Sequence, residues 1–201
     1  LSKWYAHYSK YIGSDNLYVV AHGHDPKISK LCPQANVITV PRDNLAGFDR
    51  MRGHMLNSIQ DGLGIAYDWV IRTDADELIT LDPGSYDSFA DLFDRHVDMT
   101  ALFALGLNVA GNDEAIFSSH YSKAWAVKRG THLVRHGIAK KRDTAFTLPR
   151  GVYLAHLKFA NPTALADSNR HRVKIATGPE RGLPGEGWSE AERTAKRFFD
   201  E

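Results

Sequence analysis

The sequence predicts an α/β fold in which a mostly parallel sheet is flanked by helices. Apolar runs that suit buried strands alternate along the chain with amphipathic segments that suit helices. The strand candidates are apolar throughout, as is typical of strands covered on both faces. Strands separated by helices indicate a parallel sheet, because parallel neighbours need a crossover between them.

The elements follow in order from the amino terminus. Helices are expected over residues 1–12, 47–63, 85–97, from residue 162 onward and over 189–199, and strands over 16–23, 36–40, 68–73, 99–109 and 151–160. Apolar side chains three and four residues apart support the helix at 47–63, and Gly62 and Gly64 mark its end. Asn161 followed by Pro162 is typical of a helix start, since proline suits the first helical position.

Composition bounds the classes of function. The 201 residues suit one domain, and a net charge of +1 gives no global attraction to nucleic acid or membranes. No apolar run reaches the roughly 18 residues that a membrane span needs. Cys32 is the single cysteine, so an internal disulfide is excluded, and we interpret it as a small, semi-buried apolar residue in a reducing compartment.

Residues 68–77, DWVIRTDADE, lead an apolar strand into three acids, Asp74, Asp76 and Glu77. In open α/β sheets, ligands bind beyond the carboxyl ends of the strands. Neighbouring carboxylates repel one another unless a cation or water separates them, and Mg²⁺ or Mn²⁺ accepts such oxygen ligands. We therefore predict a divalent-cation site here. The alternative is a solvated turn whose carboxylates cap the next segment.

Clusters of acidic residues also occur in calcium-binding loops and in phosphohydrolases. A calcium loop starting at Asp74 would need Gly and Glu where the chain has Ile79 and Ser85, so that reading fails. A phosphohydrolase of the haloacid-dehalogenase type would place Thr or Val where the chain has Leu78. That difference weakens the phosphohydrolase hypothesis and leaves it open.

The run YDWVIRTDADELITLDP, residues 67–83, resembles the signature of family-2-type bacterial glycosyltransferases with the GT-A fold. Segments 16–25, 48–63, 128–132 and 153–159 resemble other parts of that family in the same order. The resemblance covers about residues 1–160 and implies a Rossmann-like, mostly parallel sheet with an irregular acceptor-side half. It implies one domain over 1–201, with a nucleotide-binding half (1–83), an acceptor and metal half (84–177), and a linker with a C-terminal helix (178–201). The fold normally opens with a strand, so we expect a segment before Leu1.

The resemblance implies an inverting, metal-dependent enzyme of surface polysaccharide or glycolipid assembly. It would move a sugar from a nucleotide-sugar donor to a saccharide or lipid-linked acceptor. Asp74 and Asp76 would bind Mn²⁺ or Mg²⁺ together with His156, and His132 is the second choice for the later ligand. Asp74 would also contact the ribose of the donor.

Other residues are assigned to the donor by the same resemblance. Arg50 and Arg52, with Arg42 before them, could contact phosphate or hold the acid loop; a solvated helix face is their alternative. The family usually carries an acid at the end of the strand that here ends near Ala21. Asp25 is the expected substitute.

Inversion requires a carboxylate to deprotonate the acceptor hydroxyl. Asp113 and Glu114 are the candidates, with Asp143 as the fallback. Two alternatives stay open: a non-catalytic GT-A scaffold that binds a nucleotide sugar, and the phosphohydrolase. We expect a cytoplasmic protein, with weak peripheral contact at the inner face of the membrane as an option through the basic run 169–174. Nucleic acid is not an expected partner, because no aromatic residues are interleaved with these charges.

Overall fold

The structure is a computed structural model that describes residues 1–41, 48–111, 114–134, 136–139, 141, 143–177, 188, 190, 193 and 198. The helices are α1 (Ser2–Ile12), α2 (Lys27–Leu31), α3 (Phe48–Leu63), α4 (Phe89–Arg95) and α5 (Pro162–Thr177), with 3₁₀ turns η1 (Ser14–Asn16), η2 (Ser119–Tyr121) and η3 (Leu157–Phe159). The strands are β1 (Tyr18–His22), β2 (Asn36–Val40), β3 (Val70–Ile71), β4 (Glu77–Leu81), β5 (Ala101–Ala110), β6 (Glu114–Phe117), β7 (Lys123–Val127), β8 (Leu133–Val134), β9 (Gly137–Ile138), β10 (Phe146–Thr147) and β11 (Val152–His156).

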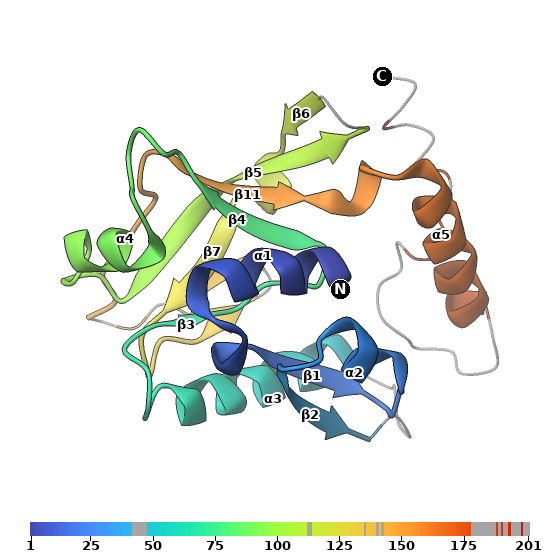
Figure 1. Cartoon of the computed structure of the whole chain (residues 1–201), viewed down its shortest axis with the longest axis horizontal. Helices are drawn as coiled ribbons and strands as arrows, with labels where there is room; N and C mark the ends of the chain where they lie inside the picture. Colours follow the sequence, from blue (N-terminus) through green and yellow to red (C-terminus); the bar gives the residue numbers. More distant parts are fainter. Residues whose placement is uncertain are drawn as a thin grey trace.

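The main sheet is mixed and curls strongly into a half-barrel, so the predicted mostly parallel, Rossmann-like GT-A sheet is wrong (Figure 1). Its order is β3-β7-β5-β11-β4, with β6 and β10 also paired to β5. Neighbours run antiparallel at β3–β7, β7–β5, β5–β6 and β11–β4, and parallel at β5–β11 and β5–β10. The strands β1 and β2 form a separate parallel pair.

The antiparallel pairing has a simple cause in the second half of the chain. β5, β6 and β7 follow one another with only a short turn or η2 between them, and no helix-length connection separates them in the described part of this stretch. Parallel neighbours need a long crossover, whereas antiparallel neighbours can be joined by a tight turn. The burial of β5 also alternates along most of its length, which is typical of a strand with one face toward the core.

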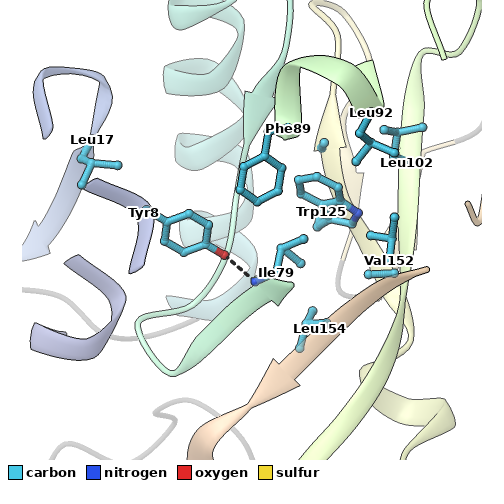
Figure 2. Close-up of a cluster of buried hydrophobic side chains, with 11 residues drawn as sticks. Tyr8, Leu17, Ile79, Phe89, Leu92, Leu102, Trp125, Val152 and Leu154 are labelled. Carbon is cyan, nitrogen blue, oxygen red and sulfur yellow. Dashed lines mark hydrogen bonds between the residues drawn. The ribbon is translucent and has the colours of Figure 1, made fainter. Parts of the chain in front are cut away.

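The core lies between α1, α4 and the concave sheet, as Figure 2 shows for its labelled side chains. Trp125 of β7 and Leu154 of β11 are fully buried, with Leu92 of α4 packed in the same cluster. Tyr8 of α1 is buried and accepts a hydrogen bond from the backbone N–H of Ile79 at 2.9 Å, drawn dashed in Figure 2. This bond ties α1 to β4, the strand that follows the acid cluster.

Gly106, in the middle of β5, lets η2 cross the sheet at close range. A Cβ atom there would lie 2.3 Å from the carbonyl carbon of Tyr121 and 2.5 Å from the backbone nitrogen of Ser122. The backbone N–H of Gly106 donates to the Ser122 hydroxyl at 2.9 Å. The absent side chain therefore fixes where η2 lies, and with it the side chain of Tyr121.

Candidate functional site

The acid loop, residues 74–77, connects β3 to β4 and is held at its entry by partners from three other elements. The backbone N–H of Arg72 donates to the carbonyl of Trp125 at 2.7 Å. The indole N–H of Trp4 donates to the Thr73 hydroxyl at 3.0 Å. The guanidinium of Arg72 donates to Asn57 Oδ1 at 2.7 Å. The loop thus starts from a fixed point, although β3 itself has only two residues.

Glu77 closes the acid loop from inside. One carboxylate oxygen accepts from the backbone N–H of Asp74 at 3.0 Å, and the other lies 2.6 Å from Lys123 Nζ. The Glu77 side chain is only 1% exposed and that of Lys123 13% exposed. A buried charge is tolerated when it is paired and hydrogen-bonded, so the ion pair accounts for the burial of this acid. Glu77 is therefore a structural member of the loop.

Asp76 and His156 meet at the end of β11. His156 stands opposite Glu77 of β4 on one side and opposite Asn108 of β5 on the other. Its Nε2 lies 3.6 Å from Asp76 Oδ2, and its Nδ1 lies 2.8 Å from Asn108 Oδ1. The backbone N–H of Leu157 donates to the Asp76 carbonyl at 2.8 Å, which brings the loop to β11.

Electrostatics keep Asp76 in its charged form. Burial raises the pKa of the Asp76 carboxyl, but the contact and the charge of His156 more than offset this, so the pKa lies below its usual value. The side chain of His156 is 5% exposed, whereas that of Asp76 is 41% exposed. The site therefore presents an ionised carboxylate at the surface and a buried imidazole behind it.

Tyr121 of η2 covers His156 from one side. The two rings stack with their centroids 3.7 Å apart and their planes 25° from parallel. Burial, and then the charge of Asp76 and of Glu77, raise the pKa of the Tyr121 phenol to about 12. The hydroxyl is therefore protonated at neutral pH and can act as a hydrogen-bond donor.

The charges of two cations act on the Asp76 carboxylate. Lys158 of η3 and Arg172 of α5 are both half-buried. Burial, and then the charge of Arg172, lower the pKa of the Lys158 amine, while Asp76 raises it. Neither cation forms an ion pair with a carboxylate of the described residues. The charge of Asp76 attracts both cations and offsets part of their mutual repulsion.

An apolar cavity of about 260 Å³ adjoins the acid loop. It lies between α1, β1, α3 and β3, and its lining includes Trp4, Tyr18, Val20, Ile59, Tyr67, Trp69 and Ile71. Arg72 and Thr73 border both the cavity and the acid loop. At one end the hydroxyls of Tyr18 and Tyr67 lie 3.2 Å apart, and that of Tyr67 donates to Asn16. The cavity can therefore offer an apolar slot with polar groups at its rim.

Of the predicted metal ligands, the structure brings Asp76 and His156 together, whereas Asp74 lies near Lys123. Asp74 is 61% exposed, and its Oδ2 lies 4.0 Å from Lys123 Nζ. The second choice, His132, pairs instead with Asp61 at 2.7 Å. The hydrogen bond with His132 holds the pKa of Asp61 below its usual value, although burial alone would raise it.

The other predicted residues lie apart or outside the description. Asp25 is exposed and accepts from the backbone N–H of Lys27, the first residue of α2, at 2.9 Å. Arg52 lies exposed on α3, and Glu114 lies exposed at the start of β6. Asp143 is exposed in a turn. Asp113, Arg42 and the side chain of Arg50 lie outside the described residues.

The sequence reasoning missed Lys123, Asn108 and Tyr121, together with the roles of Lys158 and Arg172. Asn108 carried a signal, because it is a polar residue inside the apolar run ALFALGLNVA. A buried polar side chain needs a hydrogen-bond partner, so the position of Asn108 predicts that it has one. Lys123 carried none, since its partner Glu77 is distant in the sequence.

Among the described residues, none of the helices has both the length and the apolarity that crossing a bilayer requires. Nor do three His, Cys, Asp or Glu side chains gather there closely enough to hold a metal ion. In comparisons with known proteins, no protein-family model matches the chain, and no curated protein matches it either.

Proposed function

We propose that the protein transfers a glycosyl group from a nucleotide-sugar donor, with a divalent cation held at Asp76 and His156. The observation that carries the proposal is the buried imidazole of His156, whose Nδ1 is fixed by Asn108 while its Nε2 faces the exposed carboxylate of Asp76. The resemblance of residues 67–83 to family-2-type glycosyltransferases adds the reaction class.

The geometry at His156 fits a metal ligand. Asn108 Oδ1 can only accept, so Nδ1 donates to it, and in a neutral imidazole this leaves the lone pair on Nε2. A lone pair facing a carboxylate is unfavourable unless a proton or a cation lies between them. The 3.6 Å between Nε2 and Oδ2 exceeds the roughly 2.7–2.9 Å of a charge-assisted hydrogen bond. It suits a cation bound to both atoms at about 2.1 Å each, and imidazole favours Mn²⁺ over Mg²⁺.

Lys158 and Arg172 supply the second half of the argument, a place for phosphate. The charges of Lys158 and Arg172 act on each other and on Asp76, and a further anion between the two cations would reduce their mutual repulsion. A nucleoside diphosphate is such an anion, and its oxygens would also add to the coordination of a cation that has Asp76 and His156 as its ligands among the described residues. A bound cation would neutralise charge that develops on the leaving diphosphate.

The adjoining cavity suits the nucleoside. Aromatic walls at Trp4, Tyr18 and Trp69 can pack against a base, and Thr73 and Arg72 lie where the cavity meets the acid loop. The acceptor is proposed to be a glycan or glycolipid. Glu114 is the described candidate for the base that deprotonates its hydroxyl, because β6 leaves that side chain exposed.

The test is thermal stability with Mn²⁺ and a panel of UDP-, GDP- and CMP-linked sugars. A ligand at a hundred times its Kd adds about 2.7 kcal/mol to the free energy of unfolding. We expect a metal-dependent rise in Tm with one nucleotide, retained in Asp98→Asn, an exposed control, and lost in Asp76→Asn and His156→Phe. No rise with any compound in wild type would contradict the proposal. Release of inorganic phosphate would favour the phosphohydrolase.

A further inference from the structure

The two aspartates of the acid loop have different basic partners. Asp76 faces His156, with 3.6 Å between Oδ2 and Nε2. Asp74 faces Lys123, with 4.0 Å between Oδ2 and Nζ. The ammonium of Lys123 therefore lies on one side of the Asp74 carboxylate and would repel a second cation bound there.

The side chain of Lys123 is held in this position by its ion pair with Glu77. Lys123 begins β7, its side chain is 13% exposed, and its Nζ lies 2.6 Å from a carboxylate oxygen of Glu77. The other oxygen of Glu77 is engaged by the backbone N–H of Asp74. If the ammonium moved out to solvent, it would leave a charged carboxylate buried without its partner, which is strongly unfavourable. The protein thus carries a fixed cation next to Asp74.

We infer that Lys123 is a positioning residue that keeps the divalent cation off Asp74 and assigns it to Asp76 and His156. The inference rests on the proposed metal site and adds a residue to it. Two carboxylates two positions apart would otherwise compete for one ion or attract a second. With its own cation alongside, Asp74 is instead available, at 61% exposure, to accept hydrogen bonds from neutral hydroxyl groups of a ligand.

A double-mutant cycle on Mn²⁺ affinity tests this, with free Mn²⁺ measured by electron paramagnetic resonance. In the wild-type background we expect Asp74→Asn to weaken Mn²⁺ binding less than threefold, and Asp76→Asn to weaken it at least a hundredfold. The second background is Lys123→Met with Glu77→Gln, which removes both charges of the buried pair and leaves the net charge unchanged. There, Asp74→Asn should weaken binding about tenfold, a usual size for coupled groups in contact.

Lys123→Arg is the conservative variant and should restore the wild-type pattern, in which Asp74→Asn has little effect. A role of Lys123 in folding alone would not create this coupling between positions 74 and 123. Equal losses from Asp74→Asn in both backgrounds would overturn the inference while the metal site stands. Absence of Mn²⁺ binding in folded wild type would overturn the proposed function, and the inference with it.

Discussion

The acid loop and the apolar cavity meet at Arg72 and Thr73, yet they are built on opposite principles. In the loop, Glu77 is held by the backbone N–H of Asp74 and by Lys123 of β7, and the Glu77–Lys123 pair is almost out of water. The cavity is bounded by apolar and aromatic side chains that contribute shape. Polar networks in a low-dielectric setting lose much when one member is removed, whereas apolar walls adjust. We therefore expect substitutions in the acid loop and its partners to lower the free energy of unfolding more than substitutions that line the cavity.

The largest expected effect comes from the buried ion pair. Lys123→Met leaves the Glu77 carboxylate buried without its partner, and we expect the free energy of unfolding to fall by about 3–5 kcal/mol in urea titrations. The matched control is Arg95→Met, which removes an ion pair whose arginine is 54% exposed. That control should cost less than about 1 kcal/mol. Similar losses for both variants would show that the acid loop is no more sensitive to the loss of an ion pair than the surface.

The next largest effect is expected for Gly106→Ala. The added Cβ would displace the η2 backbone, which carries Tyr121, the residue stacked on His156. The added Cβ would meet the η2 backbone at 2.3 Å, so we expect a loss of about 1–3 kcal/mol in the same titrations. Gly53→Ala in α3 is the control, since a Cβ there meets nothing within 4 Å. It should be neutral or stabilising by up to about 1 kcal/mol. A harmless Gly106→Ala would mean that η2 can move away freely.

A smaller effect should follow from filling the cavity. Val20 lines it, so Val20→Ile adds a methylene group to open space and should raise the free energy of unfolding by about 0.5–1 kcal/mol. It should also weaken binding of the stabilising nucleotide. Val19→Ile, at the neighbouring position whose side chain points to the other face of β1, should leave nucleotide binding unchanged. Destabilisation by Val20→Ile would show that the walls are rigid.

The smallest effect concerns pH and the contact of α1 with β4. The His7 ring lies 2.8 Å from the Ile79 carbonyl, and burial lowers the His7 pKa below its model-peptide value of 6.5. The unfolded chain therefore takes up the proton first, so stability present above pH 6.5 is lost as the pH falls toward the folded pKa. His7→Gln should flatten the fall of Tm between about pH 7 and 5. Some slope should remain from His96, whose pKa burial also lowers. An unchanged slope would contradict this reading.

Much of the local structure could be predicted from the sequence, because local patterns fix it. The predicted strand 36–40 and the helix at 47–63 are confirmed by β2 and α3, and Asn161 caps α5 through a bond to the backbone N–H of Ala164. The strand direction could not be read this way. Apolar runs such as β5 look alike in parallel and antiparallel sheets, and the connections between them decide the pairing.

The candidate site could likewise be predicted only where neighbouring residues in the sequence define it. The acid cluster was visible because its three carboxylates follow one another, whereas the partners that give each a different setting come from distant strands. His156 and Asn108 are 48 residues apart and meet only because β11 lies beside β5. Lys123 reaches Glu77 because β7 and β4 begin on the same side of the curled sheet (Figure 1). The metal, donor and acceptor roles stay predictions.

Gly106 also constrains how this chain can diverge during evolution. Glycine alone lacks a Cβ, so any amino-acid replacement at this codon places an atom within 2.3 Å of the η2 backbone. No single replacement there is neutral unless residues 118–122 have already shifted. A lineage that changes Gly106 would therefore lose stability unless the segment that carries Tyr121 also shifts. Substitutions at position 106 and in residues 118–122 should consequently depend on one another.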